Sequence, residues 1–170
     1  DSLTIAALAT ELTTDHVGQY IRHAHADESG LEVLLGSNSS LDEATRLQLQ
    51  FGPLGSVNLA FGNSSGDRIS ASRSRPDGRE RYLEGSRIDN IVAVASDRVL
   101  QIHLSRLDAD SQRTHGVLHV VLIPPCFRAA LVSERHGRIL GVWAGSSDRH
   151  APAHGVRYEA PAAPADRLLP

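Results

Sequence analysis

The chain of 170 residues is long enough for one well-buried domain and too short for two ordinary ones. Hydrophobic residues make up 41% and aromatic residues only 4%, so we expect a globular fold with a core of Leu, Val, Ile and Ala. The net charge of -3 argues against nonspecific nucleic-acid binding by the whole domain, because such binding needs a surplus of cations, and any contact with RNA must therefore be local.

Helical and strand-like patterns follow one another along the first half of the chain. Ile5, Leu8 and Leu12 recur at helical spacing, which predicts an amphipathic helix over residues 4–14. Two strands joined by a turn come next, and then a hairpin in which one face is apolar and the other is polar. We expect the first of these four strands to begin near Tyr20 and the other three to lie at residues 31–35, 47–51 and 57–61.

The second half opens with a loop and a short helix. Residues 62–78 are rich in Ser, Gly, Asp and Arg and predict an exposed loop, and residues 79–84 predict a short helix that Gly85 ends. Five short strands are then expected at residues 88–95, 99–104, 117–123, 129–133 and 139–143.

The predicted fold class is α+β, with two antiparallel β units and a helix opening each half. We expect one domain over residues 1–144. Residues 145–170, which are rich in Pro and Ala, predict an extended tail or linker.

Catalytic and cofactor-binding motifs are absent from the sequence. His23 and His25 share one face of a predicted strand, but no third ligand stands at a readable spacing, so we expect no metal site. The other histidines lack a nucleophile context, no glycine-rich phosphate loop is complete, and the paired carboxylates lie in polar turns. The sequence therefore predicts a protein that is not an enzyme and that has no cofactor and no small-molecule substrate.

The single cysteine, Cys126, excludes an intramolecular disulfide and a Cys-rich zinc site, and it predicts a small buried side chain. No apolar run reaches the roughly 18 to 20 residues that span a bilayer, and the N-terminal residues lack the pattern of a secretion signal. We therefore expect a cytoplasmic protein that does not contact a membrane.

Two groups of charged residues leave alternatives open. The arginines between Arg68 and Arg87 could grip phosphates or belong to a solvated loop, since neighbouring Asp and Glu residues offset much of their charge. Asp97 and Arg98 meet at a strand junction, where they could form a structural clasp or recognise a polar partner such as RNA. Their spacing alone favours the clasp, because Asp in a turn commonly bonds its own backbone.

Several segments, taken in order, resemble the N-terminal NFACT domain of the Rqc2/NEMF/RqcH family, whose bacterial members were once called fibronectin-binding proteins. Residues 3–12 resemble its opening helix, and the strands that follow resemble its first strands. Residues 83–88, Leu-Glu-Gly-Ser-Arg-Ile, are similar to its Leu-Glu-Gly-x-Arg-Ile element, and residues 96–100, Ser-Asp-Arg-Val-Leu, are similar to its Asp-Arg strand junction. Residues 137–139 and 155–161 resemble the end of its domain.

The resemblance implies an RNA-binding module with two partners, tRNA and the large ribosomal subunit that carries a stalled nascent chain. There the family supports untemplated C-terminal tailing, chiefly with alanine. The family needs its Asp-Arg pair to recruit tRNA, and this pair falls on Asp97 and Arg98, to which we add Arg87 as a tRNA-binding residue. The implied fold is related to the N-terminal domain of Fpg/MutM-type DNA glycosylases. Asp1 and Ser2 replace the Pro and Glu that base excision needs, so that catalysis is not expected.

This chain departs from the family in two segments. Residues 64–78, rich in Arg and Ser, replace a Pro-rich and Phe-Cys-Met segment, and residues 124–129 replace a Met-Gly-Arg/Lys-x-Ser-Asn segment. The family's further domains lie outside these 170 residues, so the sequence is either part of a longer protein or a divergent relative. The alternative function is a protein-interaction or adhesion domain of the fibronectin-binding kind, without an RNA function.

Overall fold

The computed structural model describes residues 2–37, 45–51, 56–61, 78–94, 98–123, 126–145, 148 and 151–160. In chain order, the elements in these residues are α1 (Ser2–His16), β1 (Tyr20–Ala26), β2 (Gly30–Gly36), β3 (Thr45–Gln50), β4 (Ser56–Phe61), the 3-10 helix η1 (Glu80–Tyr82), β5 (Arg87–Ala93), β6 (Val99–Leu107), β7 (Arg113–Ile123), β8 (Cys126–Ser133) and β9 (Ile139–Ala144). The predicted opening helix and all nine predicted strands are present, with shifted ends.

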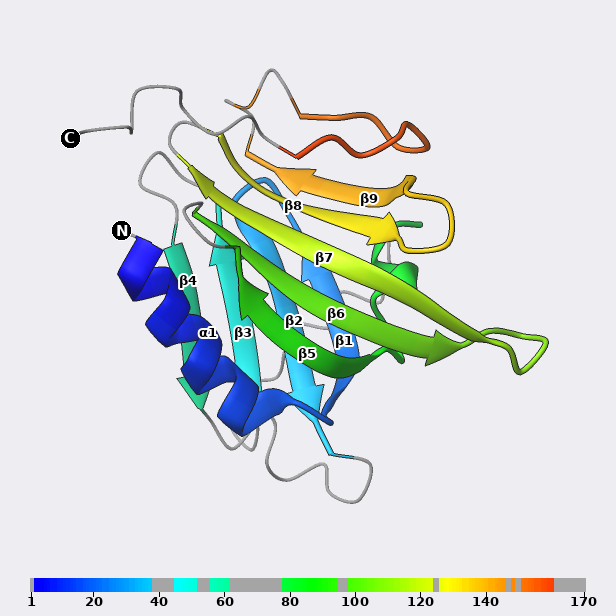
Figure 1. The fold of residues 1–170 in the computed structure, drawn as a ribbon, viewed down its shortest axis with the longest axis horizontal. Coiled ribbons are helices and arrows are strands. Elements are labelled where there is room, and N and C mark those ends of the chain that lie inside the picture. Colours follow the sequence, from blue (N-terminus) through cyan, green and yellow to red (C-terminus); the bar gives the residue numbers. More distant parts are fainter. Residues whose placement is uncertain are drawn as a thin grey trace.

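The nine strands form one sheet with the order β4-β3-β2-β1-β5-β6-β7-β8-β9, and every neighbouring pair is antiparallel (Figure 1). Strands β1 and β5 share one register pair, Tyr20 with Arg87, and the Ile88 amide donates to the Gln19 carbonyl oxygen beside it. The two predicted groups of strands are therefore joined into one sheet at this junction. The α+β class is confirmed, while the resemblance to the Fpg/MutM domain stays a prediction.

The sheet curves around a core that both groups of strands share. Leu31 and Leu49 of β2 and β3 belong to the same buried cluster as Leu100 and Leu118 of β6 and β7. Strict alternation along β2 and β3 directs every second side chain into this cluster, as the sequence predicts. The main core therefore lies on one face of the sheet.

Helix α1 packs against this core through one face (Figure 1). Ile5, Ala9 and Leu12 are buried because their spacing of three and four residues places them on the same side of the helix. The Thr13 hydroxyl donates a hydrogen bond of 2.8 Å to the Ile91 carbonyl oxygen of β5. The helix is thus held to the sheet by both apolar packing and a polar contact.

The second predicted helix is only a single 3-10 turn, η1, so the prediction of a helix over residues 79–84 is wrong in type and length. The helical conformation ends early because Gly85 has a φ of +77° and its amide donates to the Ile21 carbonyl oxygen of β1. Glu80 anchors the turn, since its Oε1 atom accepts a 2.7 Å hydrogen bond from the Trp143 indole N–H.

A smaller apolar cluster lies on β8 and β9. It consists of Ala130, Val132, Ile139 and Val142, and Tyr158 from the C-terminal segment packs against it. Backbone contacts hold this segment in place. The Ile139 amide donates to the Val156 carbonyl oxygen at 2.9 Å, and the backbones of Arg138 and Arg157 form an isolated antiparallel β-bridge. Residues 156–158 of the predicted tail therefore pack on the sheet.

Several predictions fall outside the residues that the structure describes. These include residues 62–77 of the predicted loop, Asp97, residues 124–125, the side chain of Cys126 and residues 161–170 of the predicted tail. The predicted domain boundary after residue 144 is not tested and stays a prediction. Among the described residues, no helix is both long enough and apolar enough to cross a membrane.

Candidate binding surface

Arg98, one of the predicted tRNA-binding residues, directly precedes β6. Its carbonyl oxygen accepts a 2.7 Å hydrogen bond from the Leu122 amide, so its backbone extends the pairing of β6 with β7. Its side chain is half-buried, and its Nε atom is buried without a hydrogen-bond partner among the described residues. Because a buried donor without a partner costs free energy, this guanidinium is suited to a further acceptor.

Arg87, the third predicted site residue, lies at the opposite end of the same pair of strands. In the register of β5 and β6, Arg87 is opposite Ser105, whereas Ala93 is opposite Leu100 at the end where Arg98 lies. At about 3.3 Å per residue, the length of β5 separates the two arginines by roughly 20 Å. The structure therefore does not bring Arg87 and Arg98 together, and Arg87 instead contacts Asp89 at 3.6 Å.

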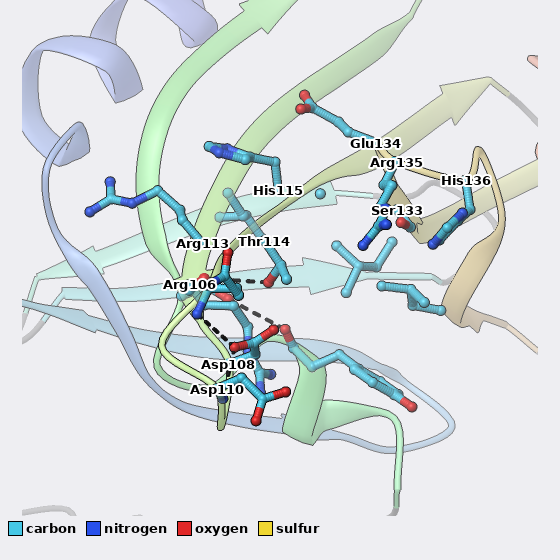
Figure 2. A pocket seen from close by; sticks show the side chains of 17 residues that line it. Arg106, Asp108, Asp110, Arg113, Thr114, His115, Ser133, Glu134, Arg135 and His136 are labelled. Atoms are coloured by element: carbon cyan, nitrogen blue, oxygen red, sulfur yellow. Dashed lines mark hydrogen bonds between the residues drawn. The ribbon is translucent and has the colours of Figure 1, made fainter.

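A groove with a volume of about 780 Å³ opens between the β6–β7 hairpin, the turn after β8, and η1 (Figure 2). Its apolar lining comes from Leu104 of β6, Leu131 of β8, Leu140 of β9 and Tyr82 of η1. Gly116 lies on β7, between β6 and β8, and pairs with Leu104 of β6. A Cβ atom at Gly116 would be 3.4 Å from Leu131 Cδ1. The missing side chain at this position helps to keep the groove open.

Charged side chains form the rim of the groove. Its arginines are Arg106, Arg113 and Arg135, its carboxylates are Asp108, Asp110 and Glu134, and its histidines are His115 and His136. Arg113 lies on the hairpin and Arg135 in the turn that follows β8, and the Arg113 side chain points away from Arg135 (Figure 2). In the register of β6 and β7, Arg113 is opposite Leu107, so its side chain is on the other face of the sheet from Leu104 and Arg106. The rim is balanced in formal charge.

The carboxylates of the rim are largely engaged within the protein. Asp108 Oδ1 accepts hydrogen bonds from the Asp110 and Gln112 amides at 3.0 and 2.8 Å, and Glu134 Oε1 lies 3.4 Å from His103 Nδ1. Within the part of the chain that the structure describes, the Asp110 carboxylate has no such contact. Most of the anionic acceptors of the groove are therefore already used.

The arginines differ from the carboxylates in this respect. Arg106 donates to the Arg81 carbonyl oxygen at 2.8 Å. Arg113 and Arg135 are exposed, and neither side chain forms a hydrogen bond or an ion pair with any described residue. Two guanidinium groups thus remain available to a partner, that of Arg135 beside the groove and that of Arg113 on the other face of the sheet.

Sequence reasoning did not find this groove. It predicts strands over residues 99–104 and 117–123, but β6 extends to Leu107 and β7 begins at Arg113. The prediction is wrong there because these strand ends are mostly exposed and pair with each other, so they lack the apolar alternation that marks a half-buried strand. The available signal was the period of two at Leu104, Arg106 and Asp108, which all line the groove.

The histidine pair of β1 has a structural explanation. His23 Nδ1 lies 2.8 Å from Glu84 Oε1, and the same oxygen accepts the Ala24 amide at 3.1 Å. His25 is exposed. In the described ranges, no three His, Cys, Asp or Glu side chains gather in a way that could hold a metal ion.

His119 of β7 is the histidine with the most altered environment. Its ring stacks on Tyr158 with 4.3 Å between ring centroids, and its Nδ1 atom lies 3.5 Å from Gln101 Nε2. Burial, with a smaller contribution from the nearby charge of His103, lowers the pKa of His119 to about 4. The ring is therefore neutral near pH 7 and helps to hold the C-terminal segment on the sheet.

Comparison with known proteins gives a match in structure. No protein-family model matches the sequence, and no curated protein matches it significantly. The N-terminal domain of the fibronectin-binding protein PavA from Streptococcus pneumoniae matches with a TM-score of 0.74 at 21% identity, over 95% of this chain and 62% of that chain.

Two further solved structures are similar. The fibrinogen binding protein from Staphylococcus aureus matches with a TM-score of 0.71 at 18% identity, over 95% of this chain and 56% of that one. The N-terminal part of the fibronectin/fibrinogen-binding protein from Streptococcus suis matches with a TM-score of 0.70 at 19% identity, over 93% of this chain and 60% of that one. The chain thus has the fold of the N-terminal domains of PavA-type proteins, and it spans less than two thirds of the length of these three chains.

Proposed function

We propose that this chain is the binding module of a longer protein and that it acts by engaging a macromolecule, without catalysing a reaction itself. The observation that carries the proposal is the fold, which matches N-terminal domains of proteins described as fibronectin- or fibrinogen-binding over 93–95% of the chain. The surface supports it as well, because the groove combines an apolar floor with polar groups at its rim, as binding sites do.

We propose that the partner is a protein, as in the descriptions of these three neighbours. Immobilised fibronectin and fibrinogen are the direct probes, with immobilised serum albumin as the control surface. We expect saturable binding to fibronectin or fibrinogen, and none to albumin, when the chain is applied at up to about 100 µM in biolayer interferometry. Binding that does not exceed the albumin signal at this concentration would contradict a role for the chain in holding either protein.

A second candidate is tRNA binding, and the environment of Arg98 favours it. This half-buried arginine has a buried Nε donor without a partner among the described residues, and it lies in the segment that resembles the family's Asp-Arg element. In the full form of this proposal, the domain contacts tRNA on the large ribosomal subunit and supports alanine tailing of the stalled chain. Asp97, Arg98 and Arg87 would then contact tRNA, the last at a separate point.

The tRNA proposal is tested with Asp97→Ala and Arg98→Ala, each compared with the intact chain in an electrophoretic mobility shift with total tRNA. Arg46→Ala is the matched control, since Arg46 is a partly exposed strand arginine whose ion pair with Glu32 is 3.3 Å long. We expect both site variants, and not the control, to weaken tRNA binding about tenfold, the order of a lost charge-assisted contact. Unchanged tRNA affinity in folded variants, with lower stability of Arg98→Ala, would show that the pair is only a structural clasp.

A further inference from the structure

We propose that the groove between the β6–β7 hairpin and the turn after β8 binds the C-terminal end of a protein partner. The free α-carboxylate of that chain end lies against the turn after β8, and its last side chain, an apolar one, lies on the leucines of the groove. The inference rests on the proposed function for the partner's class, and it adds which part of the partner is recognised. Of the predicted site residues, neither Arg87 nor Arg98 lines this groove.

The turn after β8 gathers side chains that can donate hydrogen bonds. Ser133 ends β8, Arg135 and His136 follow it, and all three line the same side of the groove (Figure 2). The turn is tight, since the Gly137 amide donates to the Ser133 carbonyl oxygen at 2.8 Å. None of these three side chains forms a hydrogen bond or an ion pair with any described residue. A hydroxyl, a guanidinium and an imidazole held in one turn suit a single carboxylate.

The opposite end of the groove carries negative charge. Asp108 and Asp110 line it at the end of the β6–β7 hairpin, away from Arg135 (Figure 2). Arg106 also lines the groove, but it is already engaged with the Arg81 carbonyl oxygen at 2.8 Å. A ligand with its negative charge at one end only fits this arrangement, because the aspartates repel further anionic groups. A nucleic acid, which carries a phosphate at every nucleotide, does not fit it.

Two charged residues near the groove belong to the other face of the sheet. Glu134 Oε1 lies 3.4 Å from Nδ1 of His103, whose side chain is on the opposite face from that of its neighbour Leu104. Arg113 also lies on that face, as the register of β6 and β7 shows. Glu134 thus contacts His103, and the guanidinium of Arg135 stays free for a ligand.

The apolar side chains beside the turn accept the last side chain of the ligand. Leu104, Leu131 and Leu140 line the groove, and the first two belong to the main core, which reaches the surface here. Gly116 pairs with both Leu104 and Ser133, and its missing side chain leaves room between them. Burial of a Leu, Ile or Val side chain in this space is favourable. The volume of about 780 Å³ lies within the range of ligand clefts, roughly 300 to 1,000 Å³.

The spacing of the two kinds of contact matches a single residue at a chain end. Ser133 and Leu131 are two residues apart on β8 and share a face of the sheet, so roughly 7 Å separates them. The last residue of a chain carries a carboxylate and a side chain on one Cα atom, so it can reach both. In an extended internal segment, an acidic side chain and its apolar neighbour point to opposite sides. The arrangement therefore favours a chain end.

Fluorescence anisotropy with short peptides labelled at the N-terminus tests the proposal. The probe is uncharged except at its end and finishes in leucine with a free carboxylate. One counterpart has a C-terminal amide, one ends in serine, and one is amidated with a glutamate placed two residues before the leucine. We expect the probe to bind about tenfold more tightly than each counterpart, since it alone offers a carboxylate and an apolar side chain on one residue.

The protein variants locate the site. Arg135→Ala should weaken binding of the probe about fivefold, as expected for an exposed ion pair, and should leave binding of the amide counterpart unchanged. Arg113→Ala is the matched control, because it removes an equally exposed and unpaired arginine from the other face of the sheet, and it should stay within about twofold of the unchanged protein.

Three results would overturn the proposal. The first is equal binding of the probe and its amide counterpart. The second is a loss in Arg113→Ala as large as that in Arg135→Ala. The third is binding of the internal-glutamate peptide, or of a labelled oligouridine, as tight as that of the probe.

The peptides also separate this inference from the proposed function. If the chain binds immobilised fibronectin or fibrinogen but does not distinguish the probe from its amide counterpart, the inference fails although the proposed function stands. If the chain binds neither protein but binds the probe through Arg135, the groove stands and those two ligands are wrong.

Discussion

The stacking of His119 on Tyr158 predicts a specific loss of stability in mild acid. The unfolded chain takes up a proton on this histidine near its ordinary pKa of 6.5, whereas the folded protein does so only near 4. Between these two pH values the unfolded state binds more protons, so the free energy of unfolding falls as the pH falls. Below pH 4 both states carry the proton, and the loss contributed by His119 stops growing.

The size of this effect follows from the two pKa values. A difference of one pH unit corresponds to about 1.4 kcal/mol, so the step from 6.5 to about 4 corresponds to at most about 3 kcal/mol. His119 is only half-buried, and solvent screening reduces the figure to about 2 kcal/mol. His119→Phe keeps a ring that can stack on Tyr158 and cannot take up a proton, so this variant should lose about 2 kcal/mol less than the unchanged protein between pH 7.5 and pH 4.

Urea unfolding at a series of pH values measures the effect, with the fluorescence of the single tryptophan, Trp143, as the reporter, since it is 5% exposed. The control is His136→Phe, which removes an exposed histidine and should leave the pH dependence unchanged. If the free energy of unfolding of the His119→Phe variant falls with pH as steeply as that of the unchanged protein, His119 is not held neutral by its environment.

Three further substitutions test the packing. Trp143→Phe removes the only described hydrogen bond to the carboxylate of Glu80, a residue that is 6% exposed, and should cost about 3 kcal/mol in urea unfolding followed by circular dichroism. Glu80→Gln keeps an acceptor for the Trp143 indole and should cost much less. Asp27→Ala removes the carboxylate that accepts hydrogen bonds from the turn between β1 and β2, and it should cost about 1 kcal/mol at pH 7. These hydrogen bonds lower the pKa of Asp27 in the folded protein. The cost of the substitution should therefore shrink only as the pH falls below 3.8, the ordinary pKa of an Asp side chain. Gly30→Ala should lower the free energy of unfolding by about 2 kcal/mol or more in the same assay, because the new Cβ atom would lie 2.1 Å from the Leu49 carbonyl oxygen. A variant as stable as the unchanged protein would show that β2 and β3 separate there at little cost.

Elements with a one-sided apolar pattern were predictable because burial itself produces the pattern. The hairpin of β3 and β4 pairs Leu47 with Leu59 and Leu49 with Val57, as the alternation of these residues predicts. The spacing of Ile5 and Leu12 likewise predicts α1, although the helix begins and ends about two residues further out.

Elements without such a pattern were not predictable from the sequence. The end of the β6–β7 hairpin is mostly exposed, so its strands are held by backbone pairing, which any residue types can form. The segment 79–84 has helix-compatible residues, but the pairing of Gly85 with Ile21 of β1 ends the helix after one turn. A contact distant in the sequence thus overrides the local preference.

The candidate sites divide in the same way. The sequence by itself determined the α+β class, the apolar faces, and the position of Arg98 at the start of a strand, because each depends on the order and period of neighbouring residues. Only the tertiary structure decided that Arg87 lies at the far end of β5 from Arg98. It alone brought Tyr82, Leu104 and Leu131 together in one groove, because strand pairing across one sheet joins segments that are remote along the chain.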